Sequence, residues 1–227
     1  RWATHGEAND VNAHPHFNSN GDLAVIHNGI IENYYSLKTE LQERGYVFRS
    51  ETDTEVLVHL IDDILKNANV ALEEAVRLAL NEVVGAYAIV VISKSNPDKL
   101  IAAKLSSPMV LGFGENELFI ASDGSPLIEH TKKVSYLEDG EMAILHIDGK
   151  VEVKSIKDNT IHVPYIHELQ LKLEQIEKGG FEHFMMKEIH EQPAILAGTL
   201  KHYVDSASNS ISLPSLPFDM KHISEVT

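Results

Sequence analysis

The fold is organised around the stretch Leu23-Ala24-Val25-Ile26-His27-Asn28-Gly29. Its first four residues form a short, continuous apolar run, and such a run predicts a buried β-strand. The strand is expected to stop at Asn28-Gly29, because this pair turns sharply and glycine tolerates positive φ. One interpretation is a plain hairpin turn, which this pair commonly makes. The other is a loop in which the Asn28 amide and the Gly29 backbone N–H converge as two donors, as an oxyanion hole requires.

Four residues outside this stretch, Arg1, Thr4, His5 and Asp53, could form a binding site with it. The forked guanidinium of Arg1 suits a carboxylate. Asp53 lies in the first turn of a predicted helix, so it should stay ionised and suits an ammonium group. With hydroxyl and imidazole donors beside them, the set fits an α-amino acid whose far end would face Asn28. Arg1 and Asp53 could also be solvated surface ions, since such residues are common, and their spacing leaves both interpretations open.

Apolar side chains recur at helical spacing in three segments, which predicts helices over residues 34–44, 52–65 and 72–83. The second helix is expected to open with Thr52 and Glu55 as a capping box. Extended apolar runs predict strands over residues 46–48, 86–92, 100–103, 110–113, 118–121, 133–137, 141–147 and 151–156. Helices followed by mostly antiparallel strands are typical of an α+β fold.

The C-terminal part predicts helices over residues 166–178 and 181–189, the second ended by Pro193, because proline lacks the N–H that continues a helix. From Ser206 the chain is rich in serine and proline, which is typical of a linker. The sequence opens on Arg1 and not on methionine. We therefore expect the natural protein to begin earlier, and this chain to be cut at both ends.

The composition bounds the class of protein. The chain has 227 residues, 43% hydrophobic and 23% charged, as expected of one large globular domain with or without part of another. Its net charge of −15 disfavours nucleic acid and anionic membranes as partners, because a polyanion would be repelled. No apolar run approaches the ~20 residues of a membrane span and no signal peptide opens the chain, so a soluble cytoplasmic protein is expected. Cysteine is absent, which excludes disulfides and thiolate metal sites within these residues.

The histidines His14 and His16, with His5 and His27, could be interpreted as a metal site, since histidine is the commonest metal ligand. A His-x-His pair can chelate on an extended strand, but no cysteine and no suitably spaced carboxylate completes a zinc-binding set. We therefore expect structural histidines and no bound metal. The metal content of the purified chain would test the alternative.

Four blocks of the sequence resemble, in order, the glutaminase domain of the glutamine–fructose-6-phosphate aminotransferase family, whose members are class II glutamine amidotransferases. They are Arg-Trp-Ala-Thr-His-Gly-Glu at residues 1–7, Val-Asn-Ala-His-Pro at 11–15, His-Asn-Gly-Ile-Ile-Glu-Asn at 27–33 and Ser-Glu-Thr-Asp-Thr-Glu at 50–55. A later block at residues 186–193 resembles the segment that joins this domain to a sugar-phosphate isomerase domain, and it disfavours other class II amidotransferases. The resemblance covers nearly the whole chain.

The resemblance implies a four-layer αββα sandwich of the N-terminal-nucleophile hydrolase type, here lacking its first strands and helix. Residues 1–190 would form the glutaminase domain, and residues 191–227 the interdomain linker and the start of the isomerase domain. The family's reaction transfers the amide nitrogen of glutamine to fructose 6-phosphate, giving glucosamine 6-phosphate and glutamate with no metal or organic cofactor. The full protein would be a homo-oligomer in which the isomerase domain is the partner of the glutaminase domain.

By the same resemblance, Arg1 binds the α-carboxylate of glutamine with support from Thr4 and His5, and Asp53 binds the α-ammonium group. The product, glutamate, would occupy the same clamp. A non-catalytic amino-acid-binding module would share Arg1 and Asp53, and it is the alternative function that the residues leave open.

The resemblance assigns the oxyanion hole to Asn28 and the backbone N–H of Gly29. Trp2 would be the gate that closes over glutamine and guards an ammonia channel, since ammonia lost to solvent is protonated and no longer nucleophilic. The nucleophile of the family is an N-terminal cysteine whose own α-amino group serves as the base. Because this chain has no cysteine, we predict that these residues alone do not hydrolyse glutamine.

Overall fold

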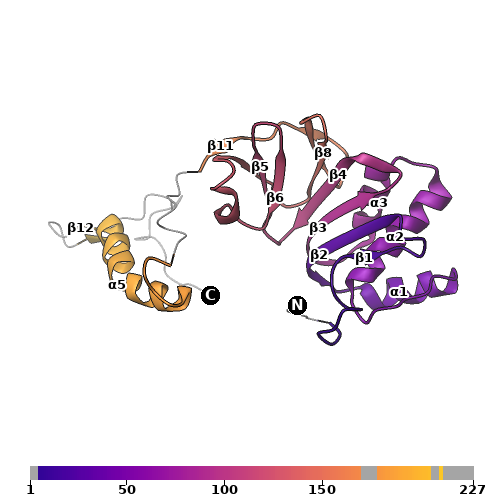
Figure 1. The fold of residues 1–227 in the computed structure, drawn as a ribbon, viewed down its shortest axis with the longest axis horizontal. Coiled ribbons are helices and arrows are strands. Elements are labelled where there is room, and N and C mark those ends of the chain that lie inside the picture. The colour runs from indigo at the N-terminus through magenta and orange to yellow at the C-terminus, as the bar shows by residue number, and fades with distance from the viewer. Residues whose placement is uncertain (1–4, 170–177, 206–209, 212–227) are drawn as a thin grey trace, which may run out of the picture. The chain divides into compact units, whose positions relative to one another are not determined.

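The computed structural model describes residues 5–169, 178–205 and 210–211. The chain divides into two compact units, Arg1–Leu171 and Lys172–Thr227. The first unit contains two β-sheets and the helices α1, α2 and α3, and the second contains α5 (Figure 1). Within the described residues, no helix is both long and apolar enough to cross a membrane.

Both sheets of the first unit are antiparallel, the larger with strand order β1-β2-β3-β4-β8-β9-β10 and the smaller with order β11-β7-β5-β6. The strands of the larger sheet are β1 His16–Phe17, β2 Leu23–Ile31, β3 Gly85–Ser93, β4 Asn96–Leu105, β8 Glu141–His146, β9 Val151–Ser155 and β10 Ile161–His162. Those of the smaller sheet are β5 Val110–Phe113, β6 Leu118–Ala121, β7 Lys133–Tyr136 and β11 His167–Glu168.

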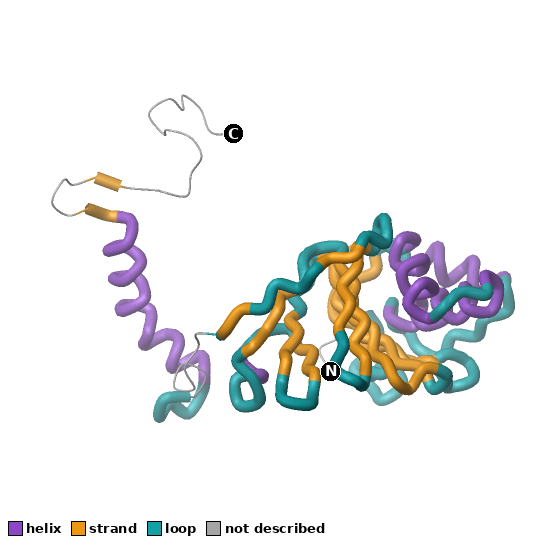
Figure 2. Tube along the Cα trace, turned by 90° about the horizontal axis from the view of Figure 1, so that it is seen from above, coloured by secondary structure: helices purple, strands orange, loops and turns teal. Residues whose placement is uncertain are grey.

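The helices α1, α2 and α3 pack on one face of the larger sheet (Figure 2). Their bounds are α1 Tyr34–Glu43, α2 Thr54–Ala68 and α3 Leu72–Glu82. The apolar stripe of α2 enters the core, where Val56, Leu57 and Ile61 are completely buried. Burial of one such side chain contributes about 1.5–3 kcal/mol, so this layer supplies much of the stability of the first unit.

The smaller sheet packs on the other side of the larger one. Ala88 and Ala102 from the larger sheet share a buried cluster with Leu111 of β5 and Leu145 of β8. A short 3₁₀ helix, η1 Ser125–Leu127, packs beside the smaller sheet through a third cluster. The described part of the first unit is therefore layered as helices, larger sheet and smaller sheet.

The expected α+β class is confirmed as a mixed α/β architecture with antiparallel sheets. The helices predicted over residues 34–44 and 72–83 correspond to α1 and α3, and the predicted strands between residues 86 and 156 correspond to β3 through β9. In the helices, the observed ends lie within a few residues of the predicted ones. Strand β4 extends further beyond its predicted range, because backbone pairing continues past the apolar run that signals a strand.

Two predicted elements of the first unit are wrong. The strand expected over residues 46–48 is a loop, because the rings of Tyr46 and Phe48 pack against His59 of α2, with centroids 5.2 and 4.8 Å away. The helix expected over residues 166–178 is wrong at its start, where β11 pairs with β7. Residues 170–177 lie outside the described part of the chain.

The second unit contains α5 Phe184–Tyr203, followed by the short antiparallel pair β12 Val204–Asp205 and β13 Ser210–Ile211. The prediction that Pro193 ends the helix is wrong, since α5 continues through it. Proline removes its own N–H bond and crowds the carbonyl four residues earlier, but the residues that follow it, Ala-Ile-Leu-Ala, include strong helix formers that continue α5. Most of the expected linker after residue 205 lies outside the described residues.

Candidate functional site

The candidate site lies where β2 ends. Asn28 and Gly29 are not in a turn: they are paired with Ala88 and Tyr87 of β3, and the strand continues to Ile31. The predicted end of the strand at Asn28-Gly29 is therefore wrong, and so is the hairpin interpretation. The reason is tertiary, because the neighbouring strand offers backbone partners to both residues.

Gly29 is required by the close approach of β3. Its φ is +134°, and a Cβ there would lie 2.0 Å from the carbonyl oxygen of Ala86, closer than real Cβ contacts come. Gly85 on β3 has a matching φ of +138°, and a Cβ there would lie 2.2 Å from the carbonyl oxygen of Ile30. The two glycines let both backbones come together beside Asn28, and a side chain at either position would push the strands apart.

The side chain of Asn28 is exposed, on the face of β2 opposite α1, α2 and α3. Side chains alternate along a strand, so Ile26 and Ile30 share that face, and they are 44% and 40% exposed. The Asn28 amide therefore lies on the side of the larger sheet that α1, α2 and α3 leave uncovered.

Asp53 connects the start of α2 to the end of β2. It is the N-cap residue of the helix, it is buried, and its Oδ2 accepts the backbone N–H of Ile31 at 2.8 Å. Its Oδ1 lies 3.8 Å from Nδ1 of His5. One carboxylate oxygen thus holds the strand while the other faces His5.

His5 packs edge-on against the ring of Tyr34 at the start of α1, with centroids 4.9 Å apart. The structure therefore brings His5, Asp53 and the Asn28-Gly29 end of β2 into one region. Three predicted site residues lie outside the described part of the chain, namely Arg1, Trp2 and Thr4.

Glu55 anchors the loop that carries Asp53, a role that the sequence did not reveal. The predicted capping box is not formed, and no side-chain hydrogen bond caps α2. The Glu55 carboxylate instead accepts the backbone N–H groups of Arg49 at 2.8 Å and Ser50 at 2.6 Å, and the Ser50 hydroxyl at 2.6 Å. Burial alone would raise its pKa, but hydrogen bonds from His59, Ser50 and Arg49 lower the pKa of Glu55 to about 2.

The network extends to Thr52, the residue expected to cap α2. Its hydroxyl contacts the Ser50 hydroxyl at 3.0 Å and Nε2 of His16 at 3.2 Å. On the other side of Asp53, the Thr54 hydroxyl contacts Nδ1 of His27 at 3.1 Å. Burial lowers the pKa of His27 more than the nearby Asp53 carboxylate raises it, so this imidazole is neutral at pH 7.

The histidines are placed by these contacts. The His14 and His16 rings meet edge to face with centroids 5.6 Å apart. Among the residues that the structure describes, no group of three or more His, Asp or Glu side chains could hold a metal ion.

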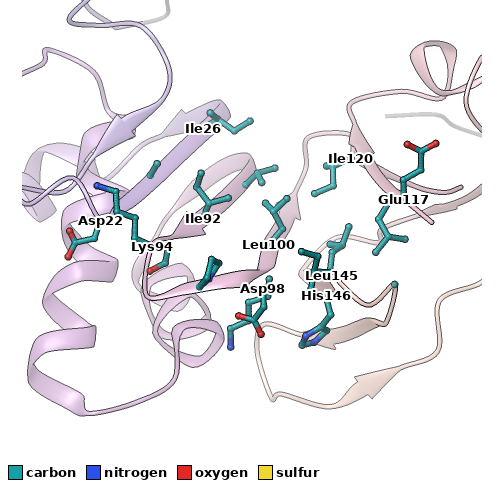
Figure 3. Close-up of a pocket in the computed structure, with 18 of the residues that line it drawn as sticks. Asp22, Ile26, Ile92, Lys94, Asp98, Leu100, Glu117, Ile120, Leu145 and His146 are labelled. Atoms are coloured by element: carbon teal, nitrogen blue, oxygen red, sulfur yellow. The ribbon is translucent and has the colours of Figure 1, made fainter. Parts of the chain in front are cut away.

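An apolar groove of 810 Å³ opens on the exposed face of β2 (Figure 3). It extends across the larger sheet to the edge strand β6 of the smaller sheet. Its lining includes Phe17, Ile26, Ile92, Leu100, Ile120 and Leu145. Asn28 follows Ile26 by two residues on the same face of β2, so the groove runs along the strand that carries the candidate oxyanion hole.

A profile of the glutamine amidotransferase domain family matches residues 5–129, which is more than half of the chain. The chain belongs to this family. The match includes His5, Asn28, Gly29 and Asp53, so the site residues that the structure describes all lie within the family domain.

Two relatives of the chain carry the same name. It is 56% identical over 202 residues to the glutamine–fructose-6-phosphate aminotransferase (isomerizing) of Chlorobaculum tepidum, a match that covers 88% of this chain and 33% of the relative. It is 50% identical over 216 residues to the protein of the same name from Bacteroides thetaiotaomicron, covering 95% of this chain and 35% of the relative. The chain thus spans about a third of the length of the curated relatives it matches.

Solved structures agree on the fold. The glutamine phosphoribosylpyrophosphate amidotransferase of B. subtilis, solved with ADP and GMP, superposes with a TM-score of 0.58 at 27% identity, over 70% of this chain and 34% of that one. A structure of the allosteric regulatory enzyme of purine biosynthesis gives a TM-score of 0.53, also at 27% identity, over 64% of this chain and 31% of that one. The mixed architecture with antiparallel sheets is therefore that of glutamine amidotransferases.

Proposed function

We propose that this chain is the glutamine-binding part of a glutamine–fructose-6-phosphate aminotransferase, which moves the amide nitrogen of glutamine to fructose 6-phosphate and yields glucosamine 6-phosphate. The family membership supports the glutamine half of the reaction. The shared name of relatives that are 44–56% identical supports the sugar half, which would be carried out by the isomerase domain of the same polypeptide.

The observation that carries the proposal is the short link between Asp53 and the Asn28-Gly29 pair along β2. The N–H of Ile31 holds one oxygen of Asp53 at 2.8 Å, and Ile31 lies two residues beyond Gly29. Two residues along a strand span ~7 Å, the scale of an extended amino acid. We infer that Asp53 binds the α-ammonium group, while the Asn28 amide and the Gly29 N–H stabilise the oxyanion that forms on the amide carbonyl.

The remaining roles follow the family pattern and belong to the same proposal. Arg1 would bind the α-carboxylate with Thr4 and His5, and Trp2 would close over the bound glutamine. The glutaminase domain would extend to residue 190, and the full protein would be a cytoplasmic homo-oligomer.

We also propose that the nucleophile is an N-terminal cysteine from outside these residues, and that the sandwich has four layers when complete. The groove supports this fold: an apolar face of the larger sheet and the outer edge of β6 lie uncovered together. Further strands could pair with that edge and cover the apolar face, which would remove an exposed edge and a large apolar surface at once.

The test is glutamate release from glutamine by three proteins. They are this chain, a chimaera in which the segment preceding the matched region of the Chlorobaculum tepidum relative is joined to Arg1, and that chimaera with Asn28→Ala. We expect no release from the chain alone and release from the chimaera. The Asn28→Ala change should lower kcat about 10²–10³-fold, because it removes one oxyanion donor.

Release by the chain alone would contradict the assignment of the nucleophile. A folded chimaera that binds glutamine without hydrolysing it would favour the non-catalytic amino-acid-binding module. An unchanged kcat in the Asn28→Ala chimaera would remove Asn28 from the oxyanion hole.

A further inference from the structure

Asn12 lies between the two loops that carry the candidate amino-acid site. Its side chain is almost completely buried, at 1% exposure. Its Oδ1 accepts the backbone N–H of Glu51 at 3.0 Å, and its Nδ2 donates to the backbone carbonyl of Glu7 at 3.0 Å and to Oε2 of Glu51 at 3.3 Å. Glu7 is two residues from His5, and Glu51 is two residues from Asp53. One carboxamide therefore links segments that are 44 residues apart.

The backbone of Gly6, next to His5, packs directly against the side chains of Asn12 and Glu51. Gly6 has a φ of +77°, and a Cβ there would lie 2.7 Å from Nδ2 of Asn12 and 3.0 Å from Cβ of Glu51. Glycine is thus needed for the loop to lie flat against the Asn12–Glu51 pair. Because His5 adjoins Gly6, a change in this contact would move His5 relative to Asp53.

We propose that Asn12 is a positioning residue that sets the distance between the two ends of the amino-acid site, an inference that rests on the proposed function. One end is the loop of His5, which leads towards the α-carboxylate, and the other is Asp53, which meets the α-ammonium group. A neutral carboxamide suits this position, because it accepts a hydrogen bond from the loop of Glu51 and donates hydrogen bonds to both loops. Aspartate would lose the donor and place a second carboxylate against that of Glu51.

The experiment compares three ligands that differ in which ends they possess, with binding to this chain followed by NMR titration. L-Glutamine carries both ends, glutaramic acid lacks the α-amino group, and 4-aminobutanamide lacks the α-carboxylate. In Asn12→Ala, we expect the affinity for L-glutamine to fall about tenfold to hundredfold. Each single-ended ligand uses one loop only, so its affinity should change by less than about threefold, within the range of weakly coupled sites.

Asn18→Ala is the matched control. Asn18 is also buried, and it links two segments: its Oδ1 accepts the backbone N–H of Leu23 at 3.2 Å and its Nδ2 donates to Asp62 at 2.9 Å. It lies at the opposite end of β2 from Asn28, so its removal should lower stability without separating the two ends of the site. We expect its affinity for all three ligands to match that of the unmodified chain.

Two further variants keep the test informative if Asn12→Ala unfolds. Glu51→Ala removes an exposed side chain that accepts from Nδ2 of Asn12 and from the N–H of Glu7, so it should fold and show a smaller loss for L-glutamine alone. Asn12→Asp should lose at least as much affinity as Asn12→Ala at pH 7.

The outcomes separate the two claims. If the unmodified chain does not bind L-glutamine, the proposed function fails, and this inference with it. If the unmodified chain binds but Asn12→Ala and Glu51→Ala keep their affinity, only the positioning role is overturned. An equal loss for all three ligands, or an equal effect of Asn18→Ala, would likewise overturn it, since a general loss of structure would then explain the result.

Discussion

The two faces of β2 differ in burial although they belong to one strand. The face towards the helices carries Val25, His27 and Ile31, none more than 5% exposed, whereas Ile26 and Ile30 on the opposite face are 44% and 40% exposed. One row of side chains packs against the helices, and the other row faces the apolar groove. Stability should therefore respond differently to changes on the two faces.

The largest expected effect comes from Gly29, because a side chain does not fit at this position. Gly29→Ala would place a Cβ 2.0 Å from the carbonyl oxygen of Ala86 at a φ of +134°. We expect it to lower the free energy of unfolding by more than ~4 kcal/mol, because strain and collision act together. Urea denaturation measures this change.

Gly45→Ala is the matched control, since Gly45 has a φ of +92° but nothing lies within 4 Å of its would-be Cβ. It should cost only about 1–2 kcal/mol, the cost of an L-residue in that conformation. Equal losses in the two variants would show that β3 moves away from Gly29 at no cost.

A comparison of Ile31→Ala with Ile26→Ala separates the two faces directly. Ile31 is completely buried against the helices, so its truncation should cost about 2–5 kcal/mol. Ile26 is 44% exposed in the groove, and its truncation should cost less than ~1 kcal/mol. Denaturant midpoints at one pH give both values. A loss at Ile26 as large as that at Ile31 would mean that the groove face is covered in solution.

The smallest effect expected of a buried side chain is that of Glu55 at the start of α2, and it depends on pH. The pKa of Glu55 is lowered to about 2, below its ordinary value of 4.5, so its carboxylate stabilises the folded state above pH 4.5. This contribution, on the order of 2 kcal/mol, is lost as the pH falls from 4.5 towards 2.

Glu55→Gln should therefore be less stable than the unmodified chain at pH 6, and the difference should shrink on acidification. Thermal melting at pH 6, 4 and 3 provides the measurement. A difference that stays constant from pH 6 to pH 3 would show that the ionisation of Glu55 contributes nothing to stability.

The sequence predicted the elements whose signal is local. The apolar runs of β5 and β6 have the bounds expected from their residues, and the apolar stripe of α2 is buried as its spacing indicates. The motif blocks at residues 1–7, 27–33 and 50–55 indicated the family to which the chain belongs. These features depend on neighbours within one or two helical turns, which a sequence displays directly.

The tertiary structure decided what Asn28-Gly29 and Glu55 do. Asn-Gly has the local chemistry of a turn, yet it lies inside β2 because Ala86 and Tyr87, almost sixty residues later, pass against it. Glu55 has the spacing of a capping box, yet it accepts from the loop before the helix, because buried N–H groups there lack another partner. Local propensity fixes neither choice, since the free energy of close approach and of burying polar groups depends on segments that meet only when the chain has folded.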